Sequence, residues 1–159
     1  MFHFRENSRT VGKTALFIYA AIMLLLLFKR SRGNTDDAYL PQLLQRINLT
    51  PFYTINLFLQ SLLHGSFIQK RLAVINLIGN VIMFIPFGLL LPDVFKSFRP
   101  FYRFFLNCLA LICLVEILQL VTLSGILDID DVILNMVGFS LGYGIYKILP
   151  KGDRQNEQR

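Results

Sequence analysis

Charged residues are scarce in this chain. Asp, Glu, Lys and Arg make up 16% of its 159 residues, whereas 54% are hydrophobic and 15 are Phe. A water-soluble domain of this length carries about a quarter charged residues. The charges also gather between apolar blocks instead of alternating with them. This distribution excludes an ordinary soluble domain and indicates an all-α integral membrane protein, for which lipid replaces much of the water.

Histidine and cysteine are also rare. His3 and His64 lie away from the polar residues described below and have no evident nucleophilic partner, which argues against Ser–His or Cys–His catalysis. Cys108 and Cys113 lie inside an apolar run without other metal-ligating residues. We therefore interpret both cysteines as small buried hydrophobic side chains, not as a disulfide or a metal site.

Four apolar segments have the length expected of membrane-spanning helices, or nearly so. They cover residues 14–28, 73–91, 101–121 and 129–149. The first falls short of the roughly 20 residues that a span needs, and residues 10–12 would extend it. A basic head precedes it, as in a secretory signal peptide, but KRSR follows directly and no small-residue cleavage site is visible. We predict an uncleaved first span and a bundle of four transmembrane helices.

This bundle would form one transmembrane domain over residues 14–149, between a basic head at 1–13 and a polar tail at 150–159. The connection from 30 to 72 is moderately apolar, and prolines interrupt it. One face of a short helix there would be lined by Leu57, Phe58, Ser61 and Leu62. We predict a short interfacial helical segment between the first and second spans. A re-entrant loop or a fifth span over residues 50–63 is the alternative.

The fourth apolar segment opens with three carboxylates, Asp128, Asp130 and Asp131, and then carries Asn135. Asp131 and Asn135 are one helical turn apart and share a face with two glycines, at 138 and 142. Polar groups in a membrane helix normally face other helices or a water-filled cavity. Asp128 and Asp130 have a simpler alternative role, which is to cap this helix and interact with its dipole. The glycines at 138, 142 and 144 are interpreted as packing residues.

Two other spans carry polar residues at the same membrane face. Asn76 and Asn80 lie one turn apart near the start of the second span, and Glu116 and Gln119 lie near the end of the third. Successive spans alternate in direction, so these residues and the start of the fourth span share one leaflet. Asn80, Glu116 and Asn135 would each lie about 7 Å below the interface. The candidate ligand-binding residues are Asn76, Asn80, Glu116, Gln119, Asp128, Asp130, Asp131 and Asn135.

The chemistry of these residues leaves several functions open. Glu116 and Asp131 are candidate catalytic residues, as an acid/base pair acting on a lipid headgroup or glycolipid. The carboxylates and asparagine carbonyls are also suitable ligands for a divalent cation. Alternatively, the polar groups bind a headgroup or an amphiphilic drug, or they only hold the helices together through hydrogen bonds and close glycine packing.

The basic residues bear on orientation. The net charge is +6, and the head, the 92–103 loop and the C-terminal end hold ten of the sixteen Lys and Arg. We interpret this charge as membrane orientation and contact with anionic lipid, not as nucleic-acid binding. It favours a cytoplasmic N-terminus and an outward-facing acidic site, although KRSR beside the first span argues for the reverse.

The order of the motifs resembles a known family. NLTPFYTI at 48–55, NLIGNVIMFIPFGLLLP at 76–92, EILQL at 116–120 and LDIDDVILNMVGFSLGY at 127–143 are together similar to the VanZ-like family of bacterial membrane proteins. The resemblance implies a multi-pass protein of the bacterial cytoplasmic membrane with a role in the cell envelope. The family's founding member is associated with resistance to the glycopeptide teicoplanin. Many members have an arginine just before the acidic run, where this chain has Ser124 and Gly125, so a cationic partner for the carboxylates is missing there.

The resemblance also selects individual residues. They are Asn48, Pro51, Phe52, Asn76, Asn80, Phe84, Pro86, Gly88, Glu116, Gln119, Asp128, Asp130, Asp131, Asn135 and Gly138. We hypothesise an outward polar pocket that binds an envelope lipid, a lipid-linked envelope precursor or a lipoglycopeptide and contributes to glycopeptide resistance. A membrane enzyme that modifies a lipid-linked envelope substrate, and a membrane assembly scaffold, are the alternatives.

Overall fold

The computed structural model describes residues 2–28 and 39–149, and the side chains of 10–28 and 39–149. The predicted tail at 150–159 and the KRSR stretch therefore lie outside the described residues. The long helices are α1 Phe2–Phe28, α4 Phe67–Val94, α5 Phe101–Val121 and α6 Ile129–Ile148. The short elements are α2 Tyr39–Leu44, α3 Tyr53–His64, the 3₁₀ helix η1 Lys96–Phe98, and the two-residue strands β1 Ile47–Asn48 and β2 Leu127–Asp128.

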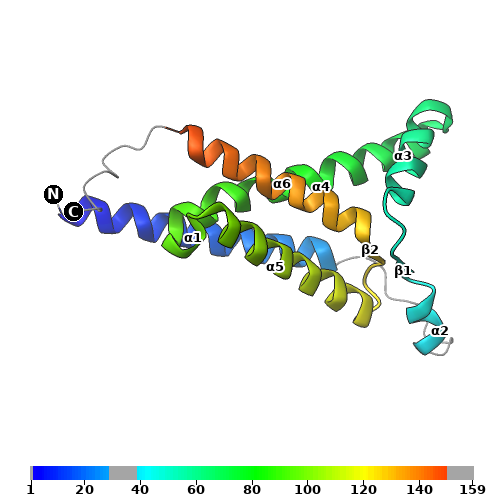
Figure 1. The fold of residues 1–159 in the computed structure, drawn as a ribbon, viewed down its shortest axis with the longest axis horizontal. Helices are drawn as coiled ribbons and strands as arrows, with labels where there is room; N and C mark the ends of the chain where they lie inside the picture. The colour runs from blue at the N-terminus through cyan, green and yellow to red at the C-terminus, as the bar shows by residue number, and fades with distance from the viewer. Residues whose placement is uncertain (1, 29–38, 150–159) are drawn as a thin grey trace.

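The four long helices run lengthwise beside one another, and α2 and α3 lie at the end of the molecule where α6 begins (Figure 1). The prediction of an all-α membrane protein is thus confirmed, and the third predicted span coincides with α5. The first helix begins earlier than expected. It starts at Phe2, so the basic head is part of the helix.

Three described helical stretches are long and apolar enough to cross a membrane. They are Thr10–Phe28, Phe67–Val94 and Phe101–Val121. The helix α6 has 20 residues, about 30 Å, but its first two turns carry Asp130, Asp131 and Asn135. Length and composition alone therefore establish three candidate spans and not the fourth.

The prediction of a short helix between the first and second spans is confirmed by α3. Its 12 residues extend about 18 Å, well short of a hydrocarbon core of about 30 Å, which argues against the alternative of a fifth span. A capping box then starts α4: the Ser66 hydroxyl accepts from the Gln69 backbone N–H, and the Gln69 side chain accepts from the Ser66 N–H at 2.8 Å. This local signal ends one helix and starts the next with no long loop.

Glycines let α4 and α6 pack backbone to backbone. A Cβ atom added at Gly138 would overlap the carbonyl oxygen of Val81, and one at Gly142 would overlap that of Ile85. The interpretation of these two glycines as packing residues agrees with this geometry. The same interpretation is wrong for Gly144, where a Cβ would meet open space because this residue faces away from α4.

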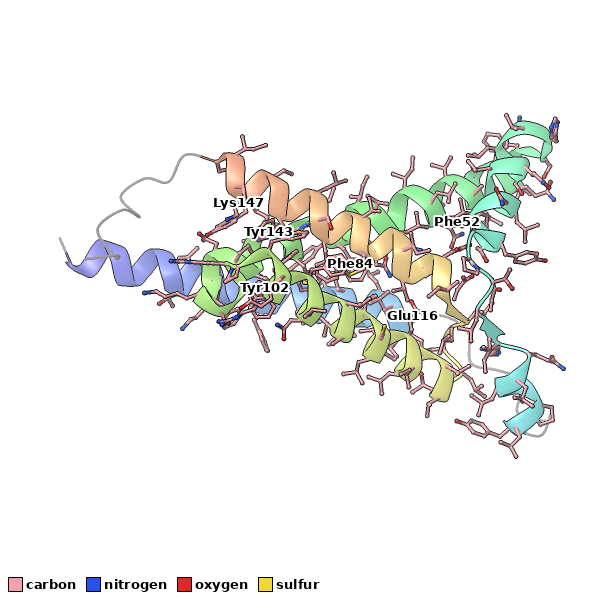
Figure 2. The ribbon with its side chains drawn as sticks, in the orientation of Figure 1. Phe52, Phe84, Tyr102, Glu116, Tyr143 and Lys147 are labelled. Carbon is pink, nitrogen blue, oxygen red and sulfur yellow. The ribbon has the colours of Figure 1, made fainter. Side chains whose placement is uncertain are left out.

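Aromatic side chains fill the space between the long helices beside this crossing. The rings of Phe84 and Phe139 are 4.9 Å apart, and those of Phe104 and Tyr143 are 4.6 Å apart. Figure 2 shows Phe84 and Tyr143 in the middle of the bundle. Cys108 is buried in this core, as predicted.

The same expectation is wrong for Cys113. This side chain is exposed, because it lies on the face of α5 that is turned away from the other helices.

Candidate functional site

A two-stranded parallel pairing joins the chain before α3 to the chain before α6. Ile47 pairs with Leu127 and Asn48 with Asp128. Next to this pair, the backbone N–H of Leu127 donates to the carbonyl oxygen of Arg46 at 2.8 Å. Segments about 80 residues apart in sequence are thereby held in one register at the end of the bundle.

Arg46 also supplies a cation to the loop that precedes the acidic run. Its Nη1 donates to the carbonyl oxygen of Leu123 at 2.5 Å and lies 3.5 Å from that of Gly125. The sequence lacks an arginine at this loop, and the structure brings one from a distant part of the chain. Its hydrogen bonds are to backbone carbonyls, so it orders the loop instead of pairing with the carboxylates.

Asp128 caps α6, which is one of the two roles that the sequence predicts for it. Its Oδ1 accepts from the backbone N–H of Asp130 at 2.9 Å. The other oxygen, Oδ2, accepts from the Thr54 hydroxyl at 2.5 Å and from the Asn48 amide at 3.2 Å. The side chain is 6% exposed. Asp128 is therefore a buried cross-link between the start of α6 and the start of α3.

Asp130 caps a different helix from the one expected. Its carboxylate accepts from the backbone N–H of Phe52 at 2.6 Å and from that of Ile55 at 3.0 Å, and it is fully buried. The first N–H groups of a helix have no acceptor within that helix, and they favour a negative charge. Phe52 itself provides no side-chain cap and has a positive φ of 62°. Asp130 thus replaces the missing cap of α3 from across the fold.

Replacing Thr54 by Val should destabilise this junction. The change keeps the side-chain volume but removes the hydroxyl that donates to buried Asp128, whose Oδ2 then keeps only the Asn48 amide as a donor. A hydrogen bond to a charged group contributes about 1.5–3 kcal/mol, which is the loss expected here. Thermal unfolding of the purified protein in detergent measures the loss. Ser61→Ala is the control, because the Ser61 hydroxyl donates only to Leu57 of its own helix. Equal unfolding temperatures for the two variants would contradict a structural role for Thr54.

Asn80, Glu116 and Asp131 meet at the same end of the bundle. The Asn80 amide donates to Asp131 Oδ1 at 2.6 Å, which links α4 to α6. Glu116 on α5 is buried, its Oε2 lies 3.5 Å from the backbone nitrogen of Asp128, and it interacts electrostatically with Asp131 and Asp128. We call Asn80, Glu116, Asp128 and Asp131 the acidic cluster. Figure 2 places Glu116 and Phe52 at this end of the molecule, near the start of α6.

The remaining candidates do not join the acidic cluster through hydrogen bonds. The Asn76 amide donates to Leu72 of its own helix at 2.8 Å, whereas the Asn80 amide donates to Asp131. The Gln119 amide donates to the carbonyl oxygen of Leu27 at 3.0 Å and ties α5 to the end of α1. Asn135 is buried, at 3% exposed, and its Oδ1 has no hydrogen-bond partner within residues 2–28 and 39–149.

A divalent cation finds little support in this arrangement. Among the described residues, no group of three or more His, Cys, Asp or Glu side chains is placed to hold a metal ion. The carboxylates of Asp128 and Asp130 already accept hydrogen bonds from protein donors on both of their oxygens. Asp131, which accepts from Asn80, and Glu116 are the other two described carboxylates at this end of the bundle.

Sequence reasoning missed three contributors to this site. Arg46 and Thr54 were not selected, and the backbone N–H groups at the start of α3 have no side-chain signature. The only available signal was the NLTPFYTI block, whose Thr50-Pro51 pair marks a turn before a helix. Nothing in that block indicates that its partner lies at Asp128 and Asp130.

A bundle of long apolar helices, cross-linked at one end by buried carboxylates, defines an α-helical membrane protein. The family model described as VanZ/LLP1 matches residues 4–150. The chain is also 37% identical over 148 residues to Protein VanZ of Enterococcus faecium, a match that covers 92% of this chain and 78% of that protein. The chain therefore belongs to the VanZ family. No solved structure matches it.

Proposed function

We propose that this protein is a multi-pass protein of the bacterial cytoplasmic membrane that binds an envelope lipid or lipoglycopeptide and contributes to teicoplanin-type resistance. The family match and the identity with Protein VanZ support the resistance role. In this proposal the N-terminus is cytoplasmic, and the acidic cluster lies at the outer face of the membrane.

The fourth span of the proposal is α6. It packs against α4 through Gly138 and Gly142, so the two helices share one environment along the crossing. Its polar residues are turned toward neighbouring helices: Asp130 and Asn135 are buried, and Asp131 bonds to Asn80. A helix that conceals its polar groups in this way tolerates the bilayer better than its mean hydropathy indicates.

The observation that carries the binding proposal is the set of acceptors around Asp131. Its carboxylate is half-buried and interacts electrostatically with that of Glu116, and the Asn135 oxygen one turn further along α6 has no protein donor among the described residues. A site rich in acceptors selects a ligand that brings hydrogen-bond donors, such as hydroxyl or ammonium groups. Glycolipids and lipoglycopeptides carry such groups on a polar part that a lipid chain anchors in the membrane.

Teicoplanin susceptibility of a sensitive bacterium that expresses the protein tests the proposal. Wild type is expected to raise the inhibitory concentration, and Asp131→Asn is expected to lose that protection because it removes one charge from the ligand-facing acid. Membrane levels are matched by immunoblot. Asp93→Asn is the control, since this exposed carboxylate lies near the far end of α4.

Equal protection by wild type and Asp131→Asn would overturn the role of the acidic cluster in resistance. No protection by wild type would overturn the resistance role itself. The same strains also address the enzyme alternative, in which Glu116 and Asp131, which interact electrostatically, form the acid/base pair. A lipid-linked envelope precursor whose mass changes only in the wild-type strain would establish catalysis in place of binding.

A further inference from the structure

An open hollow of about 350 Å³ lies against the first turns of α4, apart from the acidic cluster. It is lined by Phe67, Lys70, Arg71, Val74 and Ile75. These positions follow the i, i+3, i+4, i+7, i+8 spacing of a single helix face. The hollow therefore combines an apolar wall with two adjacent cations.

The cations lie where the charged part of α4 ends. No charged residue occurs between Arg71 and Asp93, so Lys70 and Arg71 mark the level of the lipid headgroups. Val74 and Ile75 lie about one turn deeper, along the hydrocarbon. The Arg71 guanidinium is 6.0 Å from the centre of the Phe67 ring, which holds the charge beside the hollow.

No described acidic side chain offsets these two charges. Within residues 10–28 and 39–149, the acids are Asp93 near the other end of α4 and the four carboxylates of α5 and α6. Asp128 and Asp130 are occupied at the start of α3, and Asp131 is bonded to Asn80. The two positive charges thus lie beside a hollow whose own surface is almost wholly apolar, and no described acidic side chain offsets them.

We propose that this hollow binds one anionic phospholipid. Its phosphate lies between Lys70 and Arg71, and the first part of an acyl chain lies along Val74 and Ile75. A free phosphate would leave the apolar wall uncovered, and a zwitterionic lipid would bring a cation next to two cations. This site is separate from the acidic cluster and does not depend on the resistance role.

Native mass spectrometry of the full-length protein in detergent, with added phosphatidylglycerol or phosphatidylcholine, tests the site. Wild type is expected to retain phosphatidylglycerol in preference to phosphatidylcholine. In Lys70→Gln/Arg71→Gln this retention should fall about 30-fold, since each cation near an anionic headgroup contributes roughly a factor of five. Phosphatidylcholine retention should not change.

The control is Arg103→Gln/Lys147→Gln, which removes the same charge. These two cations also lie beside aromatic rings, Tyr102 at 5.6 Å and Tyr143 at 5.3 Å. Figure 2 shows Lys147 and Tyr102, the neighbour of Arg103 in sequence, far from the start of α4, where the hollow lies. An equal loss in this control would overturn the proposal in favour of an unspecific charge effect. Equal retention of the two lipids by wild type would also overturn it.

Val74→Phe tests the apolar wall while keeping both cations. The larger ring fills the hollow, so phosphatidylglycerol retention should fall several-fold while the unfolding temperature stays near that of wild type. Displacement of phosphatidylglycerol by millimolar inorganic phosphate would show an anion site without an acyl subsite and would contradict the proposal. Unchanged retention in Val74→Phe would contradict it as well.

Discussion

Gly138→Ala is expected to disrupt the crossing of α4 and α6 and to unfold much of the bundle. The new Cβ would overlap the carbonyl oxygen of Val81, and a backbone atom cannot rotate aside as a side chain can. Overpacking in a core costs about 1–3 kcal/mol when side chains can adjust, so here we expect about 3 kcal/mol or more. Thermal unfolding of the purified protein in detergent measures this loss, and Gly142→Ala should behave in the same way.

Two other glycines of the same helices serve as matched controls. A Cβ at Gly79 on α4 or at Gly144 on α6 would meet no atom within 4 Å. Alanine at either position should not destabilise the protein and should raise the free energy of unfolding by about 0.4–1 kcal/mol, because alanine favours the helix more than glycine does. An unfolding temperature for Gly138→Ala as high as that of Gly144→Ala would rule out the close backbone packing described above.

Asp130→Ala should release the start of α3 from α6. The change leaves the backbone N–H groups of Phe52 and Ile55 without their acceptor, and hydrogen bonds to a charged group contribute about 1.5–3 kcal/mol each. We expect a loss of about 3 kcal/mol in stability. Hydrogen exchange followed by mass spectrometry should show faster exchange in a peptide covering residues 52–64.

The pattern across variants makes this prediction specific. Asp130→Asn retains one acceptor oxygen and should give an intermediate exchange rate, while Asp93→Asn should leave the rate at the wild-type level. Exchange in α5 should remain slow in all three variants, because Asp130 makes no hydrogen bond to that helix among the described residues. Unchanged exchange at 52–64 in Asp130→Ala would contradict its role as the cap of α3.

The helices of this protein follow closely from its sequence, because apolar length and helix-start signals are local. Residues 101–121 coincide with α5, and the predicted start at Ile129 is the observed start of α6. Two helix starts were misjudged. The basic head continues α1 instead of preceding it, and α4 begins at Phe67, before the predicted start at Ala73.

The candidate site follows from the sequence only in part. The alternation of span direction predicts that Asn80, Glu116 and Asp131 share one leaflet, and a hydrogen bond joins Asn80 to Asp131 in the structure. The depth argument selected Asn135 with Asn80 and Glu116, but the Asn135 oxygen has no hydrogen-bond partner among the described residues. Depth does not determine which way a side chain turns around its helix axis. Asn76 and Gln119 are therefore at the expected end of the bundle but bond elsewhere, Asn76 within its own helix and Gln119 to α1.

The sequence separates Asp131 from Asp128 and Asp130, which it offers as helix caps, but it does not show which helix each of these two caps. Only the position of α3 assigns Asp130 to the start of that helix. Asp128 and Asp130 hold the two helix starts together, whereas Asp131 turns toward α4. The partners that separate them are backbone amides and Thr54, which no local pattern connects to the acidic run.

The carboxylate cap of α3 sets an order of events during synthesis. Phe52 and Ile55 precede Asp130 by 78 and 75 residues. At about 5–20 residues per second, the ribosome adds that length in roughly 4–15 s. For this interval the nascent α3 has no acceptor for its first amides, while α4 and α5 enter the membrane. The region that carries the acidic cluster is therefore assembled last. When α6 arrives, its carboxylates form their hydrogen bonds to the start of α3 and to Asn80 of α4 together.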